Sequence, residues 1–173
     1  MPRLTLTPMT QVPQEMRSRY TRVTEAESGL ADTYRALFAS PQVACRLADL
    51  DELVGQGELE PWITYTVALT VAHERNSGAL WDSFESSARE AGVSNAVIDA
   101  IASGKAPRGL LPKEGIWVHF TQEVIRDQVR DSTWQAVVHL VGDAGAVNLA
   151  FTACYYEMMV RLNSTFGLDA ARD

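Results

Sequence analysis

Three polar side chains in one helical segment are the strongest candidates for chemistry: Tyr65, His73 and Glu74. The Tyr65 phenol could donate a hydrogen bond to a bound carbonyl group or act as a general acid. Histidine is the side chain best suited to gain or lose a proton near neutral pH, so His73 is a candidate, and Glu74 could orient or stabilise a nearby histidine. Glu74 could itself act as a general base if it is buried. Together these residues predict catalysis by proton transfer.

Each candidate also has a purely structural interpretation. Tyr65 could be a core tyrosine with a satisfied hydroxyl group. His73 could interact with the dipole at a helix C-terminus, beside a solvated Glu74. His119 and His139 lie off the apolar stripes of their segments, so we expect both at the surface.

Cysteine usage argues against metal and dithiol chemistry. The two cysteines, Cys45 and Cys154, stand alone in their segments, and the sequence has no Cys-x-x-Cys motif or zinc-type Cys/His spacing. Neither has a basic neighbour in sequence, so we expect both to be small core residues. We therefore expect no metal and no other cofactor.

Composition and charge restrict the partners. The chain has 15 Lys and Arg against 22 Asp and Glu residues, a net charge of −7, without a basic cluster, so nucleic acid is not an expected partner. The N-terminus has no apolar signal-peptide core. The longest apolar run, 144–160, contains Asn148 and Glu157, which favours a buried helix over a membrane span. We expect a cytoplasmic protein that does not cross a membrane.

The candidate residues lie in a chain of 173 residues whose hydrophobic periodicity is helical nearly throughout. We expect an extended arm over 1–12 and a single helical domain over 13–173. Prolines at 41, 61 and 112 fit the first position of a helix, and Gly142 fits the end of one. No segment alternates with a period of two, so the predicted fold class is all-α.

Three local predictions can be tested against a structure. The helix from Pro61 is apolar nearly all round, so it should be buried on both sides. Ser77 can cap the helix that begins near Ala79. The helix from Pro41 should point one stripe inward, made of Val43, Leu47, Leu50 and Val54.

Four short motifs, in order along residues 30–168, give the sequence a recognisable pattern. They are Leu37-Phe38-Ala39-Ser40-Pro41-Gln42-Val43-Ala44, Asn76-Ser77 with Trp81, Ala88-Arg89-Glu90-Ala91-Gly92-Val93-Ser94, and Tyr155-Tyr156 followed by Leu162-Asn163-Ser164-Thr165-Phe166-Gly167. With these motifs the chain resembles the carboxymuconolactone decarboxylase family, whose superfamily includes the AhpD-like alkylhydroperoxidases. The resemblance implies the helical bundle of that family. It also implies a homo-oligomer, commonly a trimer or a multiple of three.

The resemblance also shows which family residues are missing. Peroxidase members carry a Glu, a Cys-x-x-Cys and a His, and the corresponding positions here hold Tyr65, Ser77, Leu80 and Phe84. Many other relatives have Tyr, Glu and His where this chain has Ala79, Leu80 and Phe84. Serine cannot replace cysteine in a dithiol cycle, so peroxidase activity is the least expected function.

The replacements imply an apolar pocket for a flat or hydrophobic molecule. By resemblance its lining residues are Asn76, Ser77, Leu80, Trp81, Phe84, Tyr155 and Tyr156. The leading hypothesis is a cofactor-free lyase or isomerase that acts on a small hydrophobic or aromatic carbonyl compound or lactone, by decarboxylation, isomerisation or cyclisation. The rival is a non-catalytic binder or oligomeric scaffold in which the pocket is filled. A cavity of about 300 Å³ or more with Tyr65 or Glu74 inside would favour binding or catalysis.

Overall fold

The computed structural model describes residues 2–26, 29–104 and 112–169. Within these ranges the chain forms eight α-helices, two short 3-10 helices and no strand, which confirms the predicted all-α class. The elements are η1 (Met9–Gln11), η2 (Gln14–Met16), α1 (Arg17–Glu25), α2 (Ala31–Leu37), α3 (Pro41–Gly55), α4 (Pro61–Glu74), α5 (Gly78–Glu90), α6 (Asn95–Ala102), α7 (Pro112–Ile125) and α8 (Asp131–Thr165).

Helix α4 is the centre of the core. It packs against α5, α7 and α8, and every residue from Thr66 to Ala72 is buried. Its apolar residues surround the whole helix, as a helix enclosed by others requires. Pro61 occupies the first turn, where its missing N–H costs no hydrogen bond. The predicted start of α4 and its burial on both sides are therefore confirmed.

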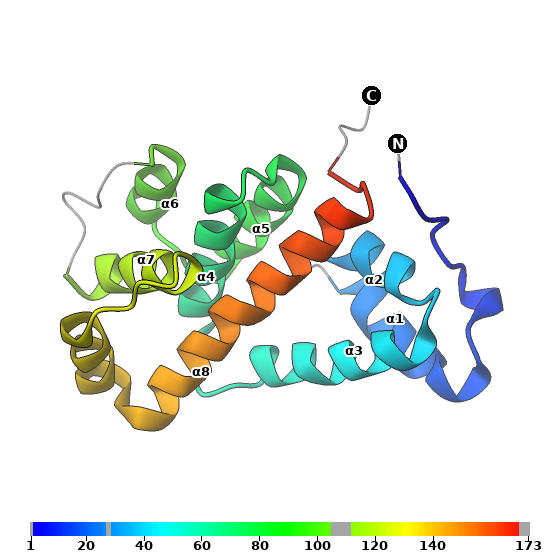
Figure 1. Ribbon diagram of the computed structural model, residues 1–173, viewed down its shortest axis with the longest axis horizontal. Helices are drawn as coiled ribbons and strands as arrows, with labels where there is room; N and C mark the ends of the chain where they lie inside the picture. Colours follow the sequence, from blue (N-terminus) through cyan, green and yellow to red (C-terminus); the bar gives the residue numbers. More distant parts are fainter. Residues whose placement is uncertain (1, 27–28, 105–111, 170–173) are drawn as a thin grey trace.

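Helix α8 runs diagonally between two groups of helices (Figure 1). The group α4–α7 lies on one side of it, and α1–α3 with the N-terminal arm lies on the other. It contacts α4 and α7 in the first group, and α2 and α3 in the second. Because α3 contacts both α4 and α8, its C-terminal half reaches the place where the two groups meet.

Gly142 breaks α8 into two segments. Its φ of 71° and ψ of 176° are not helical, and a positive φ is readily adopted only by glycine. The helix stop predicted at this position is confirmed, and the chain resumes helical geometry directly after it. The second segment carries the pair Tyr155 and Tyr156 into the core, at 2% and 6% exposure.

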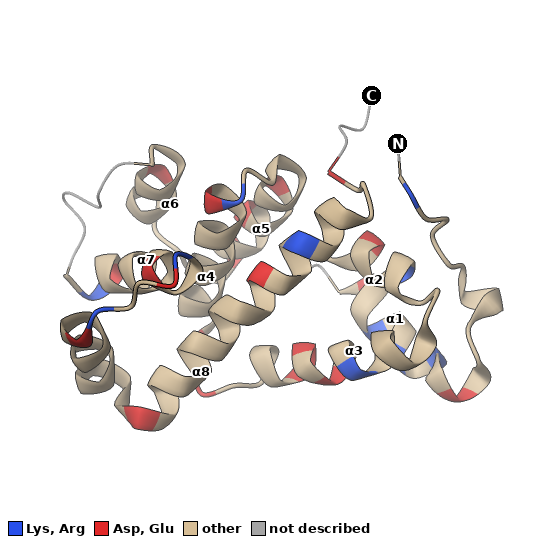
Figure 2. Ribbon diagram, in the orientation of Figure 1, with Lys and Arg blue, Asp and Glu red and all other residues tan. Residues whose placement is uncertain are grey.

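By length and composition α8 is a helix that could cross a membrane. In its most apolar window 33% of the residues are buried. A core helix can be equally long and apolar, and α8 packs against the core helices α4 and α7. Charged residues are absent from α8 between Asp143 and Glu157 (Figure 2).

The N-terminal arm lies against the helices. The Arg3 backbone N–H donates to the Phe166 carbonyl at 2.8 Å, and the Thr7 N–H donates to the Arg35 carbonyl at 3.0 Å. Val12 is buried at the end of this arm. The arm therefore adds apolar contacts as well as hydrogen bonds to the fold.

Two burial predictions are wrong. Val43 is 49% exposed, because Ala44 and Ala48 occupy the buried face of α3 at that end of the helix. The predicted Leu47 and Val54 are buried, and Leu50 is partly buried. Cys45 is buried as expected, but Cys154 is exposed. Its neighbours Ala153 and Tyr155 fall on the buried face of α8, and Cys154 lies between them on the opposite face.

Candidate functional site

A pocket of about 270 Å³ opens where α3, α4 and α8 meet. Val54 and Gly55 come from the end of α3, Pro61 and Thr64 come from the start of α4, and Leu59 comes from the loop between the two helices. The polar side chains that line the pocket are Asp51, Thr64, Tyr65 and Tyr156. The volume is close to the lower limit for small-molecule sites.

Asp51 is held in place by a short chain of hydrogen bonds. The Tyr155 hydroxyl donates to Asp51 Oδ1 at 2.6 Å. The Tyr34 and Tyr155 hydroxyl oxygens are 2.9 Å apart, and the Tyr34 hydroxyl lies 3.1 Å from the Leu47 carbonyl oxygen. Both rings are buried almost completely, so these partners fix the carboxyl group from its protein side.

The hydrogen bonds through Tyr155 and Tyr34 can be made in either protonation state of Asp51. Each tyrosine hydroxyl has one proton to donate. When Asp51 is ionised, Tyr155 donates to it and Tyr34 donates to Tyr155. When Asp51 is protonated, it can donate to Tyr155, while Tyr155 donates to Tyr34 and Tyr34 to the Leu47 carbonyl. Uptake of a proton by Asp51 therefore reverses the hydrogen bonds without removing one.

Burial sets the electrostatics of the pocket. Desolvation raises the pKa of Asp51, although the hydrogen bond from Tyr155 and the charge of Arg22 lower it in part. Desolvation, together with the nearby Asp51 carboxyl, also raises the pKa of Tyr155 and Tyr156. The two buried phenols thus stay protonated at neutral pH and serve as hydrogen-bond donors.

Tyr65 and Tyr156 form a wall of the pocket. The ring of Tyr156 packs edge-on against Phe84 and Tyr155, with centroids 5.4 and 5.3 Å apart. Tyr65 is half-buried. Neither hydroxyl makes a hydrogen bond to another described residue, so both can donate to a bound molecule.

His73 does not share this pocket with Tyr65. The two residues are eight positions apart on α4, which separates them by about 12 Å along the helix. The His73 ring lies 6.0 Å from the Trp81 ring. The His73 Nε2 atom also lies close to Gly104, because a Cβ atom added to Gly104 would be 3.3 Å from it.

Glu74 faces α7 and is firmly paired. Its carboxylate accepts a hydrogen bond from Gln122 Nε2 at 2.9 Å and forms an ion pair with Arg126 at 2.7 Å. Its side chain is 15% exposed. The structure therefore places the three predicted catalytic residues Tyr65, His73 and Glu74 in three different environments.

Asn76, Ser77 and Leu80 lie at the opposite end of α4 from the pocket. Asn76 and Leu80 line a separate polar hollow of about 580 Å³, and Asn76 adopts a left-handed conformation with φ of 53°. The sequence predicted that Ser77 caps α5. Ser77 is the residue before the helix, but its side chain makes no capping hydrogen bond. Its hydroxyl donates instead to Asp169 Oδ1 at 2.7 Å.

Around Phe84, the predicted pocket lining is packed protein. Phe84 is fully buried against Tyr156, and Leu80 is 3% exposed. Trp81 is half-buried, and its indole N–H donates to Glu85. The predicted pocket is therefore filled at Phe84, whereas Asn76 and Leu80 border the separate hollow of about 580 Å³. The Asp51 pocket lies near Tyr156, whose ring contacts Phe84.

Sequence analysis missed Asp51 and its support from Tyr34. One signal was present: Asp51 continues the spacing of Ala44, Leu47 and Ala48, so an acidic residue falls on an apolar helix stripe. The Asp51–Tyr155 contact joins residues 104 positions apart. Such a contact has no sign in local sequence.

Among residues 2–26, 29–104 and 112–169, no group of three or more His, Cys, Asp or Glu side chains is arranged to hold a metal ion. No protein-family model matches the chain, and no curated protein is similar to it in sequence.

Proposed function

We propose that this protein is an enzyme that moves a proton on a small hydrophobic or aromatic carbonyl compound or lactone, without a metal or redox cofactor. The observation that carries the proposal is the Asp51 carboxyl, whose pKa is raised by burial in a pocket that also contains two donor hydroxyls. A carboxyl base paired with a tyrosine donor is an effective arrangement for proton transfer next to a carbonyl group.

The reaction would run as follows. The hydroxyl of Tyr65 or Tyr156 donates a hydrogen bond to the substrate carbonyl oxygen. Asp51 removes a proton from the neighbouring carbon, and the electron pair of that C–H bond moves onto the oxygen as an enolate. Reversal of the Tyr155–Tyr34 hydrogen bonds then stabilises protonated Asp51. Return of the proton to a different carbon completes an isomerisation. In a decarboxylation the C–CO₂ bond breaks instead of a C–H bond, its electron pair moves onto the carbonyl oxygen as CO₂ leaves, and protonated Asp51 gives its proton to the carbon. In a cyclisation the enolate carbon attacks an electrophilic carbon of the same molecule.

We also propose that the chain is a divergent carboxymuconolactone decarboxylase-like protein. Its all-α fold, the buried helix α4 before Asn76-Ser77, and the Tyr155-Tyr156 pair on α8 support this assignment. A homo-oligomer of three subunits or a multiple, located in the cytoplasm, belongs to the same proposal. Exposed apolar side chains at Leu4 and Val129 support the oligomer, and light scattering tests it.

Exchange of ketone protons with solvent tests the chemistry directly. In deuterated water, the protein should accelerate deuterium incorporation next to the carbonyl of butanone or acetophenone, followed by NMR. Asp51→Asn should lower the rate by about 10²–10⁴-fold, since a general base contributes that much. Asp49→Asn is the matched control, because Asp49 lies on the same helix but forms surface ion pairs with Arg19 and Arg46.

The alternative is a non-catalytic binder of small molecules. The filled core around Phe84, and the absence of the family's catalytic Glu, Cys and His, favour it. In that case ketones bind in the Asp51 pocket while exchange stays at the background rate. Alkylhydroperoxidase activity is the least supported function, since a raised pKa of both thiols disfavours the reactive thiolate: burial raises the pKa of Cys45, and partial desolvation with the nearby Glu157 and Asp127 charges raises that of Cys154.

A further inference from the structure

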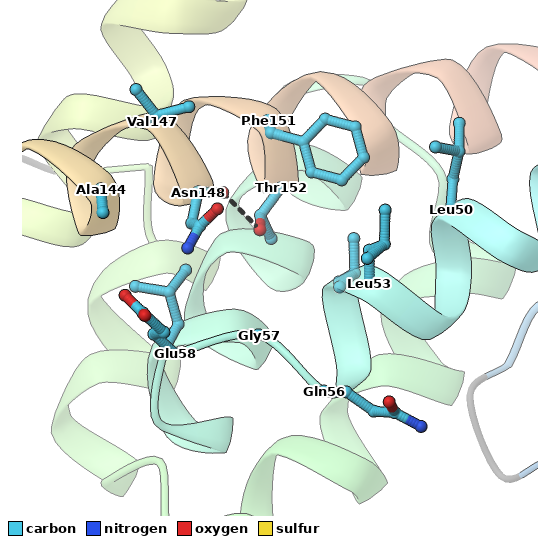
Figure 3. Close-up of a pocket in the computed structure, with 12 residues that line it drawn as sticks. Leu50, Leu53, Gln56, Gly57, Glu58, Ala144, Val147, Asn148, Phe151 and Thr152 are labelled. Atoms are coloured by element: carbon cyan, nitrogen blue, oxygen red, sulfur yellow. Dashed lines mark hydrogen bonds between the residues drawn. The ribbon is translucent and has the colours of Figure 1, made fainter.

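A second hollow, drawn in Figure 3, shares lining residues with the Asp51 pocket. It measures about 520 Å³ and lies between the end of α3, the loop 56–60 and the second segment of α8. Most of its wall is apolar, and the side chains that matter most are Leu50, Leu53, Val54, Leu59, Val147 and Phe151. We call this hollow the apolar groove.

The groove and the Asp51 pocket share a boundary. Val54 and Leu59 line both. Asp51, Tyr65 and Tyr156 line only the smaller pocket, whereas the groove has Gln56 and Glu58 on its loop side and mostly apolar side chains on α3 and α8. A molecule that fits both parts is therefore polar at its Asp51 end and apolar where it lies between α3 and α8.

The walls of the groove expose apolar surface to water. Leu53 is 62% exposed and Val147 is 60% exposed. Phe151 projects from α8, and Leu53 projects from α3, into the space between the two helices (Figure 3). Removing such surface from water is favourable by about 25 cal/mol per Å², so an apolar occupant would be stabilised here.

We infer that the substrate is elongated, with an uncharged carbonyl head at Asp51, Tyr65 and Tyr156 and an apolar tail in the groove. The inference rests on the proposed function for its chemistry. A carboxylate head is disfavoured, because the pocket is lined by Asp51 and by no Lys or Arg. Val54 and Leu59 line both spaces, and this adjacency favours the tail of the same molecule over a separate occupant.

A series of methyl n-alkyl ketones, from butanone to nonanone, measures the contribution of the tail. These probes keep one head group while the tail grows by single methylene groups. Affinity, measured by ligand-observed NMR titration, should rise about fourfold for each methylene that enters the groove, the equivalent of ~0.8 kcal/mol. It should level off when the groove is full. The sodium carboxylates of the same lengths should bind more weakly.

Two variants place a charge in the groove without touching the core. Leu53→Glu and Val147→Glu change exposed side chains, so both proteins should fold. Each should flatten the dependence on chain length and leave butanone affinity unchanged. The matched controls are Val43→Glu on α3 and Leu140→Glu on α8, which are also exposed but do not line the groove. Both controls should keep the wild-type dependence.

Three results would overturn the inference. The first is a ketone affinity that does not change with tail length. The second is a dependence of affinity on tail length that survives both Leu53→Glu and Val147→Glu, and the third is a fall in oligomer mass caused by these two variants but not by their controls. The last would show that a second copy of the chain covers the groove. Deuterium exchange of the same ketones separates the two proposals: longer tails that bind tighter without exchange refute only the chemistry, and exchange without a length dependence refutes only the groove.

Discussion

Asp51 and Glu123 are two shielded carboxyl groups with opposite surroundings. Glu123, near the end of α7, accepts hydrogen bonds from the Arg130 backbone N–H at 3.1 Å and from Arg130 Nε at 2.6 Å. It also accepts one from Thr133 Oγ1 at 3.2 Å and lies 2.9 Å from His119 Nε2. Among the residues that the structure describes, Asp51 has one donor, the Tyr155 hydroxyl.

The number of donors decides how each group titrates. Burial alone favours the neutral form of both carboxyls. For Glu123 the hydrogen bonds from Arg130 and Thr133 and the charge of His119 outweigh burial, so its pKa is lowered. For Asp51 burial wins, and its pKa is raised. A fully paired carboxylate joins two helices, whereas a sparsely paired one beside a pocket remains able to take up a proton.

The largest effect on stability should follow from removing the Glu123 charge. Glu123→Gln should lower the free energy of unfolding by about 2–4 kcal/mol, because charged hydrogen bonds at the α7–α8 corner are weakened or lost. Chemical denaturation measures the change. Glu90→Gln, at an exposed position, should stay within ~0.5 kcal/mol of the wild type. A loss under 1 kcal/mol for Glu123→Gln would show that pairing does not make this carboxylate structurally important.

The two carboxyls should also give stability opposite pH dependences. The Glu123 contribution is present above its unfolded pKa, near 4.5, and is lost as pH falls through the lowered folded pKa. The Asp51 contribution is present below its unfolded pKa, near 3.8, and is lost as pH rises through the raised folded pKa. Each unit of difference between folded and unfolded pKa corresponds to about 1.4 kcal/mol.

Urea unfolding between about pH 3 and 7 separates the two contributions. With rising pH, Asp51→Asn should gain stability relative to the wild type, whereas Glu123→Gln should lose stability relative to it. Two variants that change in the same direction would contradict the assignment of a raised pKa to Asp51 and a lowered one to Glu123.

Local sequence predicted most of the backbone. Pro41, Pro61 and Pro112 each begin a helix, and Gly142 breaks one, because proline and glycine act through the conformations they allow at their own position. The burial of α4 followed from its composition. These features depend on residues close in sequence, so a single chain is enough to predict them.

The site depended on contacts between distant residues. Ser77 has the right position to cap α5, but its hydroxyl donates a partly buried hydrogen bond to Asp169, 92 residues away. Asp51 meets Tyr155 across 104 residues. Tyr65 was predicted and does line the pocket, while His73 and Glu74 share its helix but face other elements. Nearness along a helix therefore did not indicate a shared site.

A smaller effect should come from the donor that supports Asp51. Tyr155→Phe removes the hydrogen bond that lowers the pKa of Asp51, so that pKa should rise further. The pH midpoint of ketone deuterium exchange should move upward, at a cost in stability of about 1 kcal/mol. Tyr156→Phe is the control, because the Tyr156 hydroxyl has no hydrogen bond to a described residue: kcat or KM should change while the midpoint stays. Equal midpoints in Tyr155→Phe and the wild type would contradict the supporting role.

The smallest effect should come from Glu74, although the sequence predicted a catalytic role for it. Its carboxylate resembles Glu123 more than Asp51, since Gln122 and Arg126 already bind it, and it lies about 13 Å along α4 from Tyr65. Glu74→Gln should change the exchange rate less than about twofold and, because Arg126 is mostly exposed, the stability by about 1 kcal/mol or less. Both quantities are compared with Asp51→Asn in the same assay. A hundredfold slower exchange in Glu74→Gln, with a normal rate in Asp51→Asn, would move the chemistry to Glu74 and show that pairing does not exclude a carboxylate from catalysis.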